Sequence, residues 1–234
     1  MTMRTDRAVA PTTTGALTLT LVRHGHTDLN QRHLLQGWSD SPLTPAGLDG
    51  VRTTAQHLAD RPFVAAYSSP SGRTIATAAE ILRHHDGVPL RTDHDLREYN
   101  FGHLEGRPES ALTEIIAWPE LILGILRGED PGFPGGEHAA TFLGRLRSAM
   151  DRIVTAHPDG GEVLVVGHGL ALGTWLSLVG AEFVVPANAS VTQVRVAQDG
   201  VRVEQVGVDV IAPAPREADA AGRAAAQADF APSA

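Results

Sequence analysis

The sequence contains no cysteine, no lysine and no long apolar run. The absence of cysteine excludes disulfides, thiolate nucleophiles and cysteine-based zinc or iron–sulfur sites. All 19 residues in the lysine-plus-arginine count are arginines, so a charged side chain that binds phosphate must use a planar guanidinium group. No apolar stretch approaches the roughly 20 residues of a membrane-spanning helix, and residues 1–15 lack the apolar segment of a signal peptide. We therefore expect a cytoplasmic protein without a membrane partner.

The composition fits one globular domain. At 234 residues and 42% hydrophobic content, the chain can bury a core of its own. Its formal net charge of −8 and the lack of a basic run argue against a nucleic-acid partner. The Thr/Ala/Pro-rich residues 1–16 are predicted to be a flexible arm, and the Ala/Pro-rich residues 212–234 a disordered tail. The predicted globular domain is residues 17–211.

Short β-rich runs alternate with helical patterns, which predicts an α/β fold: a three-layer sandwich with a mostly parallel central sheet. The predicted parallel strands are residues 18–22, 63–67, 88–91 and 162–166. The predicted helices are residues 45–60, 72–84, 137–156 and 170–179. Residues 191–196 and 201–208 flank an Asp-Gly turn and are predicted to form a β-hairpin.

Three details can be compared with the structure. Thr44 is the predicted N-cap of the helix that Pro45 begins, and residues 31–43 are predicted to be turns. Residues 108–136 are predicted to hold one or two short helices in a lid over the strand ends. The predicted inward face of the helix over 72–84 consists of Ile75, Ala78, Ala79 and Leu82.

Arginine and histidine follow three of the predicted strands. Arg23 and His24 end the first strand, Arg73 comes shortly after the second, and His168 follows the most apolar one. Ligands of open α/β sheets bind outside the carboxyl ends of the strands, so these side chains are expected to share one crevice. Guanidinium groups and helix N-termini bind a dianionic phosphate well. Gly25, which has no Cβ, is expected to let the backbone approach that ligand.

An imidazole beside a bound phosphoryl group can attack phosphorus and form a phosphoramidate that water later hydrolyses. Nearby arginines would keep His24 neutral and nucleophilic, and a second imidazole at His168 could stabilise the phosphoryl oxygens. Glu98 is the candidate acid for the leaving alkoxide. Other carboxylates of that segment remain alternatives: Asp93, Asp95 and Glu105. This chemistry requires no metal ion and no cofactor.

Five segments between about residues 17 and 197 carry a resemblance. They are Leu21–Gly25 with Thr27 and Asn30; Gln36–Gly37 with Asp40–Thr44 and Gly47; Tyr67–Pro70 with Arg73, Thr74 and Thr77; Leu96–Gly106; and Gly135–Glu137 followed by His168–Gly169. In this order they resemble the histidine phosphatase superfamily, the phosphoglycerate mutase-like clan. His26 and Gly167 depart from its pattern, which often has an acidic or other polar residue and a serine at these positions.

The resemblance implies a phosphoglycerate mutase-like fold and roles by position. His24 would be the phosphorylated nucleophile and Glu98 the proton donor. Further phosphate-binding residues would be Arg23, Arg73 and His168, together with Asn30, Thr27 and Gly25. Leu34, Trp38, Tyr99 and Trp118 are candidate walls of the pocket beyond the phosphate.

Residues 96–106 resemble the phosphatase branch of the superfamily. We therefore expect a metal-independent phosphomonoesterase that acts on a small phosphorylated metabolite. A cofactor-dependent phosphoglycerate mutase is the alternative enzyme, and a binding protein for a phosphorylated ligand is the alternative of another class. The physiological substrate and the oligomeric state cannot be read from the sequence, and a homodimer stays open.

Overall fold

The computed structural model describes residues 15–210, so most of the predicted arm and all of the predicted tail lie outside the described residues. Six strands form one sheet in the order β3-β2-β4-β1-β5-β6. Their bounds are β1 Leu17–Arg23, β2 Phe63–Ser68, β3 Leu90–Thr92, β4 Gly161–Gly167, β5 Val191–Ala197 and β6 Gly200–Val208. The predicted α/β fold is confirmed.

The sheet is parallel over β1 to β4, and β5 and β6 form the predicted hairpin, with β5 antiparallel to β1. The central strand β4 is buried from Glu162 to Gly167, as expected for a strand with helices on both faces. Because β1, β2 and β4 run in one direction, their carboxyl ends lie along the same edge of the sheet.

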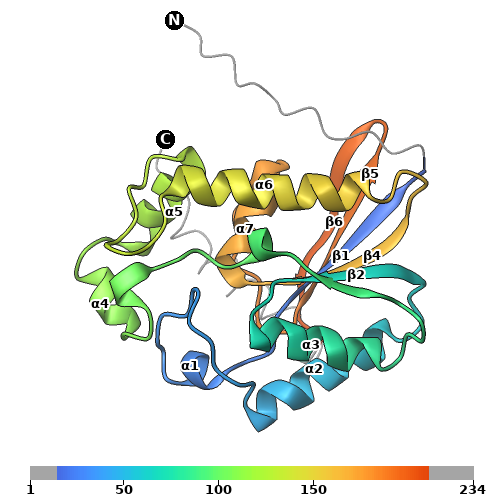
Figure 1. The fold of residues 1–234 in the computed structure, drawn as a ribbon, viewed down its shortest axis with the longest axis horizontal. Helices are drawn as coiled ribbons and strands as arrows, with labels where there is room; N and C mark the ends of the chain where they lie inside the picture. Colours follow the sequence, from blue (N-terminus) through green and yellow to red (C-terminus); the bar gives the residue numbers. More distant parts are fainter. Residues whose placement is uncertain (1–14, 211–234) are drawn as a thin grey trace, which may run out of the picture.

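Helices cover both faces of the sheet (Figure 1). On one face lie α2 (Pro45–Leu58) and α3 (Gly72–Leu82), and on the other lie α6 (Ala139–Thr155) and α7 (Gly169–Leu178). Each face encloses its own apolar cluster, of which the larger one lies beneath α6 and α7. The predicted N-cap of α2 is confirmed, since Thr44 Oγ1 accepts the N–H of Gly47.

One prediction about local structure is wrong in part, and one short helix was not predicted. Asp28–Gln31, for which no element was predicted, form the short helix α1, which Thr27 and Asn30 close with a reciprocal capping box. The expected turns over 31–43 are confirmed, since only Gln31 of that range is helical. In α3 the buried residues are Arg73, Thr74, Thr77, Ala78 and Ile81, whereas Ile75 and Ala79 are exposed. The apolar pattern failed there because the buried face of α3 carries polar groups that are bonded inside the protein.

The predicted lid contains two short helices, α4 (Glu109–Thr113) and α5 (Trp118–Arg127), at the end of the molecule where α1 also lies (Figure 1). Two 3₁₀ turns precede it, η1 (His94–Leu96) and η2 (Gly102–Leu104). An isolated antiparallel bridge joins Leu34 to Pro108, and the N–H of Glu109 donates to the carbonyl of His33 at 3.0 Å. Among residues 15–210, no helix is both long and apolar enough to cross a membrane.

Candidate active site

The neighbouring ends of β1 and β4 bring the two predicted catalytic histidines together. Arg23 of β1 pairs in register with Gly167 of β4, so the next residues, His24 and His168, leave the sheet side by side. Their ring centroids are 5.4 Å apart in an edge-to-face arrangement. Arg73, in the first turn of α3, reaches the same place, with its Nη2 3.0 Å from His168 Nδ1. The structure thus brings the residues from three strand ends into one cluster.

His24 presents a neutral ring with one free lone pair. Its Nδ1 lies 2.8 Å from the carbonyl oxygen of Gly25 and must therefore carry the proton, because a carbonyl can only accept. The lone pair consequently sits on Nε2. Burial lowers the pKa of His24 well below 6.5, and the charges of Arg73 and Arg23 lower it further. His24 lines the main cavity, so this nitrogen is suited to attack a phosphorus atom placed there.

His168 lies behind His24. Its Nδ1 accepts a hydrogen bond from Arg73, which leaves Nε2 to donate to Ser69 Oγ at 2.8 Å. Burial, followed by the charge of Arg73, lowers the pKa of His168 well below 6.5. His168 is not among the cavity-lining residues. In this conformation it packs against His24, and its one N–H is bonded to Ser69 instead of facing the expected phosphate position.

The guanidinium group of Arg73 differs from the expected phosphate fork. Nη1 donates to the carbonyl of Ser39 and to Asp40 Oδ1, and Nη2 donates to the carbonyl of Gly37 and to His168. The Nε–H is buried without a partner. Arg73 therefore supplies positive charge from behind the imidazoles and fixes the ring of His168, while the loop over 37–40 holds its terminal N–H groups.

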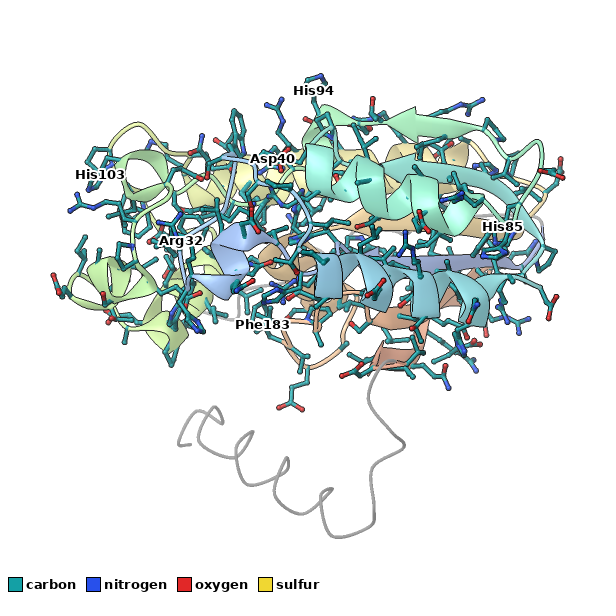
Figure 2. The ribbon with its side chains drawn as sticks, turned by 90° about the horizontal axis from the view of Figure 1, so that it is seen from below. Arg32, Asp40, His85, His94, His103 and Phe183 are labelled. Carbon is teal, nitrogen blue, oxygen red and sulfur yellow. The ribbon has the colours of Figure 1, made fainter. Side chains whose placement is uncertain are left out.

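Carboxylates occupy the helix N-termini that were expected to donate to phosphate. Asp40 accepts the N–H of Gly72 at the start of α3, and Figure 2 shows it beside that helix. Glu98 accepts the N–H groups of Leu170 and Ala171 at the start of α7, at 2.8 and 2.9 Å. The expectation of free helix N–H donors is corrected on both helices, because the chain provides its own anions there.

Arg23 is an arginine whose side chain lines the cavity. Its Nη1 donates to the carbonyl of Pro186 at 2.7 Å, and its Nε–H is buried with no partner. An unsatisfied N–H in a buried, positively charged group is costly, and an anion in the cavity would relieve this cost. Arg23 lines the cavity next to His24, which places this charge where a phosphoryl group would lie against the imidazole.

Glu98 is the buried carboxylate of the cavity, only 5% exposed. Burial raises its pKa, while hydrogen bonds from the N–H groups of Tyr99 and Leu170 and the charge of Arg23 oppose the rise. The alternative acids lie elsewhere: Asp93 and Asp95 pair with Arg152 at the surface, and Glu105 binds the backbone of the 37–39 loop.

Arg145 of α6 fixes the segment that carries Glu98. It donates to the carbonyls of Asp95, Arg97 and Glu98 at 2.7 to 2.9 Å. It also pairs with Glu137, whose Oε1 accepts the N–H of Asn100. The Gly-Gly-Glu segment before α6 thus ends in the carboxylate that holds this arginine in place.

Asn30, Thr27 and Gly25 were expected to contact phosphate, and only Asn30 lines the cavity. The Oδ1 of Asn30 accepts from the N–H and hydroxyl of Thr27. Thr27 is used as the N-cap of α1. Gly25 donates its N–H to Thr77 Oγ1 at 3.0 Å, and a Cβ there would lie 2.5 Å from Val51 Cγ2. Gly25 and Thr27 therefore support packing around the site, and neither lines the cavity.

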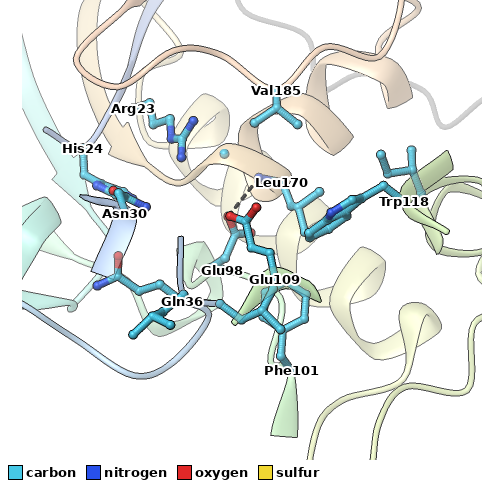
Figure 3. A pocket seen from close by; sticks show the side chains of 14 residues that line it. Arg23, His24, Asn30, Gln36, Glu98, Phe101, Glu109, Trp118, Leu170 and Val185 are labelled. Atoms are coloured by element: carbon cyan, nitrogen blue, oxygen red, sulfur yellow. Dashed lines mark hydrogen bonds between the residues drawn. The ribbon is translucent and has the colours of Figure 1, made fainter. Parts of the chain in front are cut away.

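The cavity has a volume of about 360 Å³. In Figure 3, Arg23, His24 and Asn30 lie at one end, Trp118 lies at the other, and Glu98 and Glu109 lie between them in this view. Seven apolar side chains contribute to the lining: Leu34, Leu35, Phe101, Trp118, Ile122, Leu170 and Val185.

Of the predicted walls, Leu34 and Trp118 line the cavity, and Trp38 and Tyr99 do not. Trp38 donates from Nε1 to the carbonyl of Glu98, and Tyr99 is a core residue whose hydroxyl donates to Asp130. Eight further lining residues were not predicted as site or wall residues: Leu35, Gln36, Phe101, Glu109, Ile122, Gly169, Leu170 and Val185. Only the pairing of residues 33–35 with 106–109 could have indicated Glu109.

Within residues 15–210, no group of three or more His, Asp or Glu side chains converges in the manner of a metal site. His85, the remaining buried histidine among residues 15–210, packs on Phe63 and lies far from Asp40 in Figure 2.

Comparison with known proteins shows the family of the chain. Residues 19–209 match the histidine phosphatase superfamily (branch 1). A Yersinia pestis (strain Pestoides F) protein named "Probable phosphoglycerate mutase GpmB" is 38% identical over 158 residues, which cover 67% of this chain and 72% of that protein.

Two solved structures are also similar. Phosphoglycerate mutase from Bacillus anthracis str. Sterne superposes with a TM-score of 0.72 and 29% identity, over 83% of this chain and 94% of that chain. Alpha-ribazole phosphatase from Shigella flexneri shares the fold, with a TM-score of 0.70 and 21% identity over 85% of this chain and 100% of that chain. The sequence match spans the sheet, both helix layers and every residue of the cavity; the chain belongs to the histidine phosphatase superfamily.

Proposed function

We propose that the chain is a metal-independent phosphomonoesterase that hydrolyses a small phosphorylated metabolite through a phosphohistidine at residue 24. The observation that carries the proposal is the state of His24: its Nδ1–H is bonded to the Gly25 carbonyl, so the Nε2 lone pair is free in a cavity that also holds Arg23. Its lowered pKa keeps this nitrogen unprotonated at neutral pH.

In the first step, His24 Nε2 attacks phosphorus while Arg23 neutralises the phosphoryl oxygens. The P–N bond forms as the ester P–O bond breaks, and the electron pair of that bond leaves on the alcohol oxygen. Glu98 donates its carboxyl proton to this oxygen and becomes a carboxylate. Burial raises the pKa of Glu98, which favours the protonated form that the step requires, while the N–H groups of Leu170 and Ala171 favour the carboxylate that the second step uses.

In the second step, the Glu98 carboxylate takes a proton from a water molecule whose oxygen attacks phosphorus. The P–N bond breaks, its electron pair returns to Nε2, and inorganic phosphate leaves. His168 and Arg73 are positioning groups for this chemistry, because Arg73 orients His168 and His168 packs against the His24 ring.

The test is phosphate release from 4-nitrophenyl phosphate in excess EDTA. We expect turnover by the full chain, loss of turnover in His24→Ala, and an acid-labile, alkali-stable phosphoryl group on residue 24 after rapid quenching into alkali. His26→Ala is the matched control, since His26 is the neighbouring histidine and does not line the cavity. Equal turnover in His24→Ala and the unmodified chain would refute the proposal, and so would a lack of turnover in the unmodified chain.

A phosphoglycerate mutase is the second candidate, favoured by the name of the 38% identical relative. A mutase returns the phosphoryl group from the histidine to its substrate, whereas a phosphatase passes it to water. Incubation with 3-phosphoglycerate, with and without a bisphosphoglycerate primer, distinguishes the two. Primer-dependent formation of 2-phosphoglycerate without free phosphate would support the mutase, and release of phosphate would support the phosphatase.

A further inference from the structure

The cavity holds very little positive charge beyond the phosphate position. Arg23 is the only arginine among the described residues that line it, and His24 is neutral. The lining instead includes two carboxylic acids, Glu98 and Glu109. A dianionic phosphate can be balanced by Arg23 and by the charge of Arg73 behind the imidazoles. A second anionic group on the substrate would have no cationic partner in this lining.

The part of the cavity away from His24 is apolar and contains a tryptophan. Trp118, at the first position of α5, packs edge-to-face on Phe101, with ring centroids 6.3 Å apart. Ile122, one turn further along α5, and Leu34 also line the cavity. Burial of an apolar or aromatic group against these side chains is favourable, while a polar group in contact with Leu34 or Ile122 would lose water without gaining a hydrogen bond from them.

Glu109 is fixed at this site by the backbone. Its N–H donates to the His33 carbonyl at 3.0 Å, and the bridge between Leu34 and Pro108 lies directly before it. It begins α4, and its exposed side chain contributes to the cavity lining and lies within electrostatic range of Arg23.

We propose that the cavity selects phosphate monoesters of apolar or aromatic alcohols that carry no second negative charge, and that Glu109 is the residue that rejects such a charge. This proposal rests on the phosphatase function proposed above. It names the substrate class of the same site, and it assigns the charge selection to Glu109 and the preference for apolar groups to Trp118.

Three aryl esters test the charge selection: 4-ethylphenyl phosphate, 4-(carboxymethyl)phenyl phosphate and 4-(2-aminoethyl)phenyl phosphate. The saturated spacers keep the reactivity of the three phenol leaving groups similar. Differences in kcat/KM therefore report how the cavity accepts the charge of each ester. We expect kcat/KM for the anionic ester to be about tenfold below that of the neutral one, because like charges repel at short range in a partly shielded site. The cationic ester should match or exceed the neutral one.

Glu109→Gln keeps the size of the side chain and removes its charge. We expect the ratio between the neutral and anionic esters to fall to within about twofold in this variant. Glu114→Gln is the control, because Glu114 is an exposed acid at the end of the same helix and does not line the cavity. A ratio near one in the unmodified chain, or a ratio that Glu109→Gln leaves unchanged, would overturn the assignment to Glu109.

Trp118→Ala tests the apolar part. It should lower kcat/KM for 4-ethylphenyl phosphate by about tenfold more than it lowers kcat/KM for methyl phosphate. Leu123→Ala, an exposed residue of the same helix, is the control. Equal effects of Trp118→Ala on both esters would contradict the proposal.

The two proposals can fail separately. If the unmodified chain hydrolyses none of the esters, the phosphatase proposal fails, and the ranking is then measured as dissociation constants by calorimetry. Tighter binding of the neutral and cationic esters than of the anionic one, lost in Glu109→Gln, would still support the selection. The reverse ranking, or equal binding of all three, would refute it.

Discussion

The two ends of the cavity are built in different ways. At the His24 end, the functional groups follow strands β1 and β4, and backbone groups fix the individual atoms: the Gly25 carbonyl holds His24, and two N–H groups of α7 hold Glu98. At the Trp118 end, Glu109, Trp118 and Ile122 come from α4 and α5 of the lid, and Leu34 comes from the loop that pairs with Pro108. Hydrogen bonds fix the side chains at the His24 end, whereas apolar packing positions those at the Trp118 end.

This difference indicates a division of labour. Atoms that make and break bonds must be held in place, and strand ends with buried hydrogen bonds provide this. Recognition of the alcohol requires only a shape and a charge, which a short helical insertion can change without disturbing the chemistry. Changes at the His24 end should therefore affect all esters, and changes at the lid end should affect only some.

The largest expected effect follows from Glu98→Gln. Glutamine keeps much of the shape but cannot donate the carboxyl proton, so kcat/KM for an alkyl phosphate should fall by about 10²- to 10⁴-fold. The comparison uses kcat/KM because this constant reports the steps up to transfer of the phosphoryl group to His24, before Glu98 acts as the base on water. The loss should be much smaller for 4-nitrophenyl phosphate, whose phenolate leaves readily without a proton. Steady-state kinetics with both esters measures the two losses. Glu105→Gln is not a suitable control, because Glu105 accepts hydrogen bonds from backbone N–H groups of the loop over 37–39. An equal loss for both esters would show that Glu98 is not the acid.

Arg145→Met should have the largest effect on stability. Removal of Arg145 leaves Glu137 buried without its charged partner and frees three carbonyls of the segment that carries Glu98. Loss of one partner of a buried ion pair typically costs about 3–5 kcal/mol of unfolding free energy. Urea denaturation measures this cost, with Arg147→Met, an exposed arginine of the same helix, as the control. A change below about 1 kcal/mol would mean that the Arg145 network does not stabilise the segment.

The buried imidazoles should make stability depend on pH. Burial lowers the pKa of His24 and of His168 below 6.5, so in more acidic solution the unfolded chain binds protons that the folded chain does not. The unfolding free energy should therefore fall as pH drops below about 6.5, by up to about 1.4 kcal/mol per pH unit for each histidine. The raised pKa of Glu98 acts in the opposite direction, since its contribution is present at low pH and is lost as pH rises through its folded pKa.

His168→Gln isolates one part of this dependence. The variant should have a smaller slope of unfolding free energy against pH between about 5 and 6.5, whatever its absolute stability. Urea denaturation across this range gives the slope, and His103→Gln, at an exposed position shown in Figure 2, should leave it unchanged. An unchanged slope in His168→Gln would show that this ring is protonated in the folded chain as readily as in the unfolded one.

The sequence predicted the His24 end better than the lid end, for a physical reason. A strand that ends in Arg23-His24 and another that ends before His168 are local patterns, and parallel pairing places their ends together. Glu109 reaches the cavity through pairing between residues 33–35 and 106–109, which are far apart in the chain and carry no periodic pattern.

Local patterns also failed where polar groups are buried for the site. The inward face of α3 contains Arg73, Thr74 and Thr77, so an assignment based on apolar spacing chose Ile75 and Ala79, which are exposed. Local patterns also could not show that the terminal N–H groups of Arg73 and the N-terminus of α3 already have partners within the chain. These partners are Asp40 and the carbonyls of the 37–39 loop, which lie far from Arg73 in the sequence and belong to no motif around it.

The smallest expected effect lies where the two ends meet. A Cβ on Gly169 would lie 3.2 Å from Arg23 Cζ and 2.9 Å from Val185 Cγ1, so Gly169→Ala must displace the guanidinium group, the valine or both. A small displacement of Arg23 should lower kcat/KM by about three- to tenfold for every ester, because this group balances the phosphate charge in the proposed mechanism. If Val185 moves instead, only esters with bulky alcohols should be affected.

Gly144→Ala is the matched control, since a Cβ at this exposed position of α6 meets no atom within 4 Å. Alanine in a helix should stabilise the chain as well as glycine or better. The pattern of loss across small and bulky esters therefore shows which end of the cavity Gly169 supports.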